Sequence, residues 1–340
     1  MGLSTKTARI IAARAQATAR GAPAKAYCGA MTQPSPRPAP PHGAKPVVGR
    51  VVNRVDVALI ALVTISWGLS YPVMKFVVNA YPPATFRALS FAVGVASLWA
   101  YMRWRGEPLA VPRAVWLRLG KLGLMNMMLW HAGLIYGLTL LASGRAATIG
   151  YTMPVWATLA AVLWFGERLT WRGLLGLLLA LGSTALLAQH EWQAMAGQPM
   201  GLALVLGAAM AWGTGTAMMK HTPVALPQTT VTFWMLVMAM LMFTVLALST
   251  ETQRWAWPDL WQWLAILYGG AWTFAVCYVA WFTVVKKLTP TQSGLSVTLV
   301  PVFGVLGGVW FLGETLVWVD LAALGLTLAA MAVVLGARAR

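Results

Sequence analysis

The chain of 340 residues is too apolar and too poor in charge for a soluble fold. Hydrophobic residues make up 59% of it, charged residues make up 10%, and the mean hydropathy is +0.69. A soluble domain carries about 25% charged residues. We therefore expect an integral membrane protein, and the long apolar runs favour helices over a β-barrel. The net charge of +17 then indicates anchoring of cytoplasmic loops rather than binding of nucleic acid.

The first 55 residues differ from the rest of the chain. They hold nine lysines and arginines and no Asp or Glu, and Pro and Ala crowd residues 33–41. This composition predicts a disordered basic cytoplasmic tail at 1–55. The stretch also resembles an organellar transit peptide, since it is rich in Arg and free of acids. An over-extended start with Met31 as the initiator is a third explanation, so it stays open whether residues 1–30 belong to the mature protein.

Ten apolar segments follow, each near the roughly 20 residues that a helix needs to span a bilayer. In the first half, residues 56–190, they are 57–78, 84–102, 119–139, 144–165 and 170–188. In the second half, residues 200–337, they are 200–220, 228–249, 260–285, 291–312 and 318–336. We predict an all-α polytopic membrane protein with ten transmembrane helices.

The basic residues predict the orientation of these helices. With the N-terminus inside the cell, 21 of the 25 lysines and arginines fall in the tail, the C-terminus or the loops on that side. The four near the other side are Lys75, Arg87, Arg145 and Arg254. An excess of positive charge marks the cytoplasmic side, so both termini are expected in the cytoplasm.

The two halves share a signature in their fourth segments, 147 residues apart. The matched positions are Pro154 and Pro301, Gly166 and Gly313, Glu167 and Glu314, and Trp171 and Trp318. In the first segments, Trp67-Gly68 and Lys75 recur 145 residues later as Trp212-Gly213 and Lys220. Such a repeat in an apolar chain indicates a transporter built from two related halves.

Five helices per half is an odd number, so the second half enters the membrane from the opposite side. The halves are then inverted repeats, related by a pseudo-two-fold axis in the membrane plane, as in many secondary transporters. Such symmetry gives two nearly equivalent states, one open to each side of the membrane.

With these motifs, residues 56–335 resemble two units of the EamA-type family of the drug/metabolite transporter superfamily. The resemblance is carried by the Trp-Gly of each first helix and by the Pro and Gly-Glu of each fourth helix. It implies a ten-helix carrier of the plasma (inner) membrane, usually an exporter of small metabolites, amino acids or drugs. It does not imply a particular substrate.

Polar and aromatic side chains in the third segments indicate a substrate site. A polar group inside the hydrocarbon is costly and is a functional hypothesis by default. Asn126 and Trp130 are four residues apart and share a helix face. The repeat offset maps Asn126 onto Thr273 and His131 onto Tyr278, and inverted repeats bring equivalent positions together at the midplane. The predicted substrate-binding residues are Trp67, Asn126, Trp130, His131, Tyr151, Trp212, Trp272, Thr273 and Tyr278.

Other roles remain open for some of these residues and for the prolines. Interhelical hydrogen bonding would also explain the polar groups, and His131 is a candidate for proton coupling as well as for packing. Pro154 and Pro301 each remove a backbone hydrogen bond, so we expect helix kinks that line the cavity.

Charged residues near helix ends form a second group of candidates. Lys75, Glu167, Lys220 and Glu314 are possible gating or coupling residues. The lysines can instead reach the membrane surfaces, and each glutamate can instead cap the helix that follows it. Arg87 and Arg145 lie near a predicted external boundary, which favours interfacial anchoring.

We therefore expect a secondary transporter that exports a small metabolite, amino acid or drug-like solute by alternating access. The alternatives are an uptake carrier of the same fold, a lipid flippase and an intramembrane enzyme. Catalysis would need a buried acid, a histidine pair or an activated nucleophile, and only His131 comes near that. We expect no catalytic residues, no metal site, no cofactor and no nucleic-acid partner. The sequence leaves the substrate, the coupling ion and the oligomeric state open.

Overall fold

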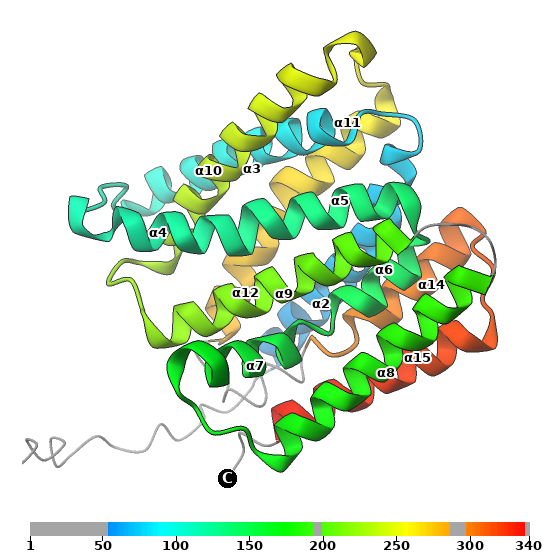
Figure 1. Cartoon of the computed structure of the whole chain (residues 1–340). Helices are drawn as coiled ribbons and strands as arrows, with labels where there is room; N and C mark the ends of the chain where they lie inside the picture. Colours follow the sequence, from blue (N-terminus) through cyan, green and yellow to red (C-terminus); the bar gives the residue numbers. More distant parts are fainter. Residues whose placement is uncertain (1–53, 194–198, 286–296, 337–340) are drawn as a thin grey trace, which may run out of the picture. The chain divides into compact units, whose positions relative to one another are not determined.

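The computed structural model describes residues 54–193, 199–285 and 297–336, which form helices joined by short connections (Figure 1). No strand occurs in these three ranges. Residues 1–53 of the predicted tail at 1–55 lie outside the described residues. The first helix begins at Arg54, three residues before the predicted start.

The helices follow the order of the predicted apolar segments. The first half holds α2 (Arg54–Val78), α3 (Pro83–Arg105), η1 (Arg113–Val115), α4 (Trp116–Gly123), η2 (Leu124–Leu129), α5 (Trp130–Leu140), α6 (Ser143–Gly150), α7 (Met153–Phe165) and α8 (Trp171–Gln193). The second half holds α9 (Pro199–His221), α10 (Gln228–Thr250), η3 (Thr252–Arg254), α11 (Leu260–Leu267), η4 (Tyr268–Val276), α12 (Cys277–Val285), α14 (Val300–Leu312) and α15 (Trp318–Gly336).

Within the described residues, six helical stretches are long and apolar enough to cross a membrane. They are Arg54–Val78, Ser143–Phe165, Trp171–Gln189, Pro199–His221, Gln228–Thr250 and Leu260–Trp281. Val300–Leu312 and Trp318–Val334 are shorter apolar helices. The two other predicted spans are not among these stretches; α3 contains Arg87, and the third segment contains Asn126 and His131.

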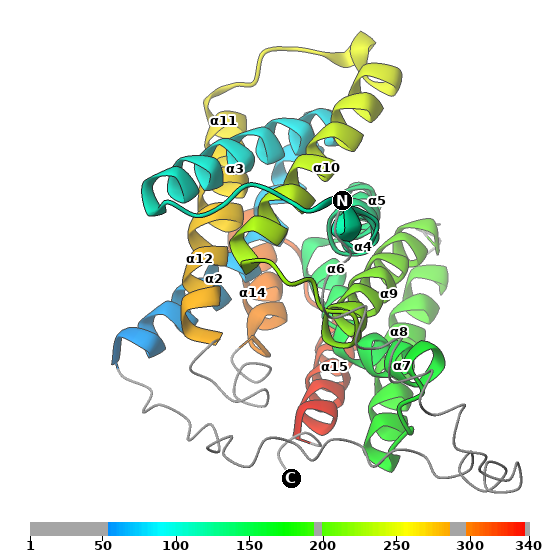
Figure 2. The same ribbon diagram turned by 90° about the vertical axis from the view of Figure 1, so that its left-hand side faces the viewer.

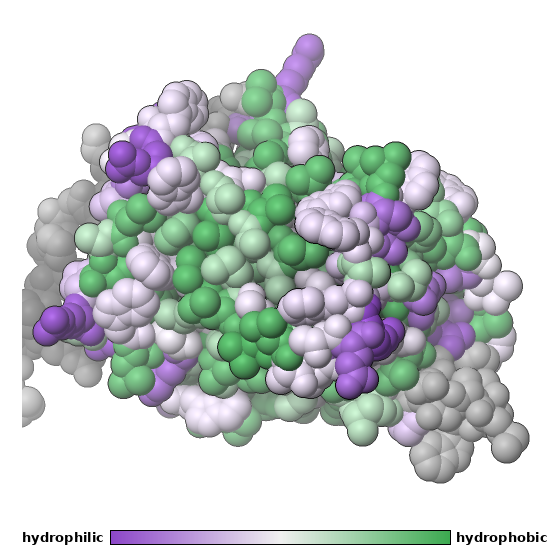
Figure 3. Space-filling model, turned by 90° about the horizontal axis from the view of Figure 1, so that it is seen from above, coloured by the Kyte–Doolittle hydropathy of each residue, from purple (hydrophilic) through white to green (hydrophobic). Residues whose placement is uncertain are grey.

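Large apolar side chains lie on the outer surface as well as in the core. Leu241, Val245 and Leu248 of α10 are 57%, 66% and 53% exposed. Seen from above, apolar residues form green patches over the middle of the face, with pale residues between them and hydrophilic groups at several places around them (Figure 3). Apolar side chains exposed in this way suit contact with lipid chains.

The closest helix pairs link the two halves and come in reciprocal sets. α2 packs on α14 and α9 packs on α7, so the first helix of each half meets the fourth helix of the other. α12 packs on α2 and α5 packs on α9 in the same way (Figure 2). α3 also packs on α10, and α8 on α15, which pairs like with like. The contacts of α2 with α14 and α12 therefore recur, with the halves exchanged, as the contacts of α9 with α7 and α5.

A glycine in each first helix lets it approach the opposite fourth helix closely. A Cβ added to Gly68 would lie 2.4 Å from Phe303 Cβ and 2.8 Å from Val300 O. A Cβ added to Gly213 would lie 2.7 Å from Met153 O. Met153 and Val300 each precede the repeated proline. The Trp-Gly and Pro motifs therefore recur together because they contact each other across the halves.

The Gly-Glu part of the signature ends the fourth helices. Gly166 and Gly313 follow α7 and α14 with φ of 68° and 66°, the left-handed conformation that glycine adopts without strain. In both places the next amide donates to the carbonyl six residues earlier, at 3.1 Å. The same backbone device thus stops both helices.

The repeated prolines lie at the starts of helices rather than inside them. The fourth segment of the first half is divided into α6 and α7 by a turn at Tyr151 and Thr152. Pro154 is in the first turn of α7, where its missing N–H removes no helical hydrogen bond. Pro301 holds the same position in α14, and residues 286–296 before it lie outside the described part.

The third segment of each half passes through a π-helical stretch, η2 or η4. Shifted by 147 residues, η2 falls on the last six residues of η4. Short π-helical stretches are frequent at functional sites because the extra residue per turn redirects side chains. Asn126 and Thr273 are equivalent positions within them.

We expect Gly213→Ala to destabilise the protein by about 1–3 kcal/mol, because the added methyl group overpacks a backbone contact. The check is the thermal unfolding midpoint of the full chain in detergent. Gly207→Ala on the same helix is the matched control, since its Cβ would meet no atom within 4 Å. Equal midpoints for the two variants would contradict the tight contact between α9 and α7.

Candidate functional site

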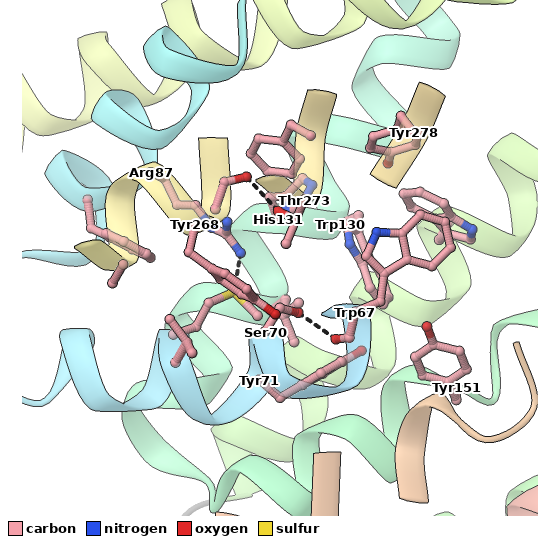
Figure 4. A pocket seen from close by; sticks show the side chains of 18 of the residues that line it. Trp67, Ser70, Tyr71, Arg87, Trp130, His131, Tyr151, Tyr268, Thr273 and Tyr278 are labelled. Atoms are coloured by element: carbon pink, nitrogen blue, oxygen red, sulfur yellow. Dashed lines mark hydrogen bonds between the residues drawn. The ribbon is translucent and has the colours of Figure 1, made fainter. Parts of the chain in front are cut away.

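A cavity of about 100 Å³ lies between helices of both halves (Figure 4). Its wall is formed by residues of α2, α3, α5 and α7 from the first half and of α9, α11, η4 and α12 from the second. A space of this size holds a few water molecules or a small chemical group. Because both halves contribute, a movement between them would change its shape.

The structure brings seven of the nine predicted binding residues to this wall. These are Trp67, Trp130, His131, Tyr151, Trp212, Thr273 and Tyr278. Asn126 and Trp272 do not line it. Asn126 Nδ2 donates to Trp212 O at 3.2 Å on α9, and Trp272 Nε1 donates to Ser66 Oγ at 2.9 Å with the ring 38% exposed. Their polar groups make hydrogen bonds between helices. Such bonding is the role that the sequence left open as an alternative to substrate binding.

Aromatic rings of the two halves meet around the cavity. Trp130 and Trp212 have ring centroids 5.2 Å apart, and Trp67 and Tyr278 have theirs 5.8 Å apart. These four rings offer flat, apolar and polarisable surfaces to a solute. The geometry suits an apolar or aromatic group.

His131 lies in an aromatic cluster beside the cavity. Its ring is edge-on to Phe91 and Phe274, with centroids 5.1 and 5.2 Å away. The side chain is 6% exposed, and neither ring nitrogen hydrogen-bonds to a protein group in the described part of the chain. Both nitrogens are therefore available for a ligand or for water.

Arg87 is buried beside the cavity, and the prediction that it anchors at the interface is wrong. Its side chain is 2% exposed and lines the wall. The first turn of α3 is covered because Glu251, at the end of α10, accepts from Ala84 N at 2.9 Å and Thr85 N at 2.7 Å. The sequence does contain evidence for a functional role of Arg87. It is the one charged residue within residues 84–102, and a charge in an apolar span indicates a functional site by default.

Glu314 caps a helix of the other half. Its carboxylate accepts from Ser143 N at 2.6 Å and Gly144 N at 3.2 Å, at the start of α6. The expected target was the following helix, α15, but the first-turn acceptor there is Asp320, which accepts from Val317 N at 3.1 Å. Glu314 caps α6 because α14 lies beside α6 in space. The sequence did not reveal this contact.

The repeat-equivalent Glu167 lies in a different setting. It accepts a short hydrogen bond from Lys220, and His221 Nε2 lies 3.0 Å from it. Lys75, the repeat equivalent of Lys220, donates from Nζ to Leu138 O at 2.8 Å. These groups lie at the ends of the α2–α14 and α7–α9 pairs. Lys220 and Glu167 thus join the ends of α9 and α7, whereas Lys75 joins α2 to α5.

The family of the chain follows from comparison with known sequences. The model of the EamA-like transporter family matches twice, at residues 56–189 and 199–336. The chain belongs to this family. It is a multi-pass membrane protein of a transporter family, as the apolar helices and the two matches together require.

The relatives agree with this assignment. The chain is 24% identical to the uncharacterized transporter YoaV of Bacillus subtilis, over 72% of this chain and 85% of that protein. It is 25% identical to the uncharacterized inner membrane transporter YedA of Escherichia coli K12, over 82% and 89%. It is also 25% identical to a probable amino-acid metabolite efflux pump of Salmonella typhimurium, over 85% and 98%.

A solved crystal structure shares the fold. It has a TM-score of 0.60 and 22% sequence identity, and the match covers 85% of this chain and all of that one.

We expect Glu314→Ala to lower stability by about 1–2 kcal/mol, because it removes a partly buried cap and leaves two amides of α6 without an acceptor. Glu167→Ala, at the equivalent position, is the control. Its pair with Lys220 is exposed by 36% and 55%, so the loss should stay below about 1 kcal/mol. Thermal unfolding of both variants in detergent checks the order, and a larger loss for Glu167→Ala would contradict it.

Proposed function

We propose that the chain is a secondary transporter of the plasma (inner) membrane that moves a small metabolite, amino acid or drug-like solute through the central cavity. Ten helices, arranged as two inverted five-helix repeats with both termini in the cytoplasm, alternate between states open to either side. The family assignment and the transporter names of the relatives support this class.

The observation that carries the proposal is a cavity built from reciprocal contacts. Residues of both halves form its wall, and the contacts of α2 with α14 and of α9 with α7 are equivalent under exchange of the halves. Two packings that differ little in free energy allow a site between them to face either side.

Export is the favoured direction of transport. One relative that covers 85% of the chain is named a probable efflux pump. The excess of basic residues at the predicted cytoplasmic side sets the expected orientation of the helices, which suits export and uptake equally.

A lipid flippase is the second candidate because a groove adjoins the cavity. The groove, of about 450 Å³, lies between α2, α11 and α14. Val73, Ala265 and Tyr268 belong to both walls, so movement of these side chains would connect the cavity with the bilayer. Among the described residues of the central wall Arg87 is the one Lys or Arg, and a phospholipid headgroup would favour more basic groups, so this supports a small solute.

Counterflow in proteoliposomes tests the transport function. Vesicles containing the full chain are loaded with one unlabelled solute from a panel of metabolites, amino acids and drug-like compounds, and uptake of labelled tracer is followed. A carrier makes the tracer accumulate transiently above its equilibrium level. We expect Ser70→Phe, which fills the cavity, to reduce the initial rate of tracer uptake at least about tenfold, a loss of about 1.4 kcal/mol in transition-state stabilisation.

Leu163→Phe is the control for this experiment, since Leu163 is 63% exposed on the outside of α7. Counterflow of a solute that survives in Ser70→Phe would contradict transport through the cavity. The same vesicles with a fluorescent phospholipid test the flippase: translocation of the phospholipid with no counterflow of any solute would replace the proposal.

A further inference from the structure

A buried cation without a carboxylate partner faces the cavity. Arg87 is 2% exposed, and an arginine side chain stays charged inside proteins. Among the described residues, its guanidinium lies against soft and aromatic groups. The Nη2 donates to the sulfur of Met74, and the guanidinium carbon lies 5.7 and 5.9 Å from the ring centroids of Phe86 and Phe274.

The carboxylates at the same end of the helices are engaged elsewhere. Glu251 accepts from the first turn of α3, Glu314 accepts from the first turn of α6, and Asp320 accepts from Arg145 Nε at 2.7 Å. No Asp or Glu is found in the cavity wall, as far as the described residues form it. The described part of the protein therefore does not neutralise Arg87.

Burying an unpaired charge is unfavourable, and cation–π contacts offset only part of it. An anion in the cavity would complete the site, because a carboxylate accepts two parallel hydrogen bonds from a guanidinium. The charge and its position thus indicate the chemical class of the ligand.

Further polar groups without protein partners line the same cavity as Arg87. Arg87 Nε, Tyr71 Oη and both nitrogens of His131 are buried and make no hydrogen bond within the described part of the protein. Tyr71 and His131 are 3% and 6% exposed and line the same cavity. Figure 4 shows Arg87 extending from α3 into this group of side chains. A phenol O–H and a guanidinium N–H both donate, which suits an acceptor such as a carboxylate.

We propose that the transported solute is a small organic monoanion whose carboxylate is bound by Arg87 and Tyr71. Its aromatic or branched aliphatic body lies against Trp67, Trp130 and Trp212. This deepens, and rests on, the proposed transport function. A zwitterionic amino acid brings an ammonium group for which the described wall has no carboxylate, and a phosphate dianion brings more charge than one guanidinium neutralises.

Four probes with one carbon skeleton test the charge preference. They are 3-phenylpropionate (anion), phenylalanine (zwitterion), 3-phenylpropanamide (neutral) and 3-phenylpropylamine (cation). Ligand affinity is measured on the purified full chain from the rise of its thermal midpoint with concentration. We expect 3-phenylpropionate to bind at least about tenfold more tightly than the other three, the ratio expected when one good charged pair decides the binding.

Arg87→Met keeps the length of the side chain and removes the charge. We expect it to weaken binding of 3-phenylpropionate at least about tenfold, while the midpoint of the unliganded protein stays equal or rises because a buried unpaired charge is gone. Arg87→Lys keeps the charge but loses the planar fork, so its affinity should fall in between. Arg254→Met, an exposed arginine in η3, is the control and should bind like the unsubstituted protein.

Three results would overturn the anion site. They are equal binding of the amide or amine by the unsubstituted protein, unchanged binding of 3-phenylpropionate in Arg87→Met, and loss of that binding in Arg254→Met as large as in Arg87→Met. Counterflow of a neutral or cationic solute would leave the transport function standing while this inference falls. Binding of 3-phenylpropionate that depends on Arg87, without counterflow, would support the anion site and overturn the transport function.

Discussion

The close approach of two backbones at Gly68 and at Gly213 is the constraint on which the rest of the structure depends. Each glycine lets the first helix of one half meet the start of the opposite fourth helix, at distances that a Cβ would not allow. The cavity lies beside both contacts and takes residues from α2 and α9, the helices that carry these glycines. Lipid chains are as apolar as the helices, so packing of this kind rather than hydrophobic burial must hold the halves together.

The same arrangement sets the chemistry of the cavity. Tryptophan and tyrosine rings from both halves give it an apolar wall, and Arg87 adds a positive charge that no described carboxylate neutralises. Stability alone would favour an apolar residue at such a place. We therefore propose that the charge serves to bind a ligand, and that binding between two reciprocal halves couples the ligand to movement of the halves.

The sequence predicted the helical class, the family and seven of the 19 residues of the cavity wall, because these depend on hydropathy and on a repeat visible at one offset. Trp67 and Trp212 were found as members of a repeated motif, and His131 as a polar residue in an apolar run. The sequence did not reveal that α14 lies beside α6, so the partner of Glu314 was missed. The sequence predicts Arg87 at the interface because Arg87 lies near the end of its apolar segment. Its burial depends instead on how Glu251 and α10 cover α3, which the sequence does not show.

The accessibility of the cavity from the two sides of the membrane tests the central claim most directly. In a Cys28→Ser, Cys277→Ala background, Ser70→Cys places one thiol in the cavity wall. Lys220→Cys and Arg254→Cys mark the two ends. The vesicles are right-side-out or inside-out and are treated with a membrane-impermeant thiol reagent. Alternating access predicts that each end marker reacts from one side only and that Ser70→Cys reacts from both. Reaction of Ser70→Cys from a single side would contradict a site that the two halves expose in turn.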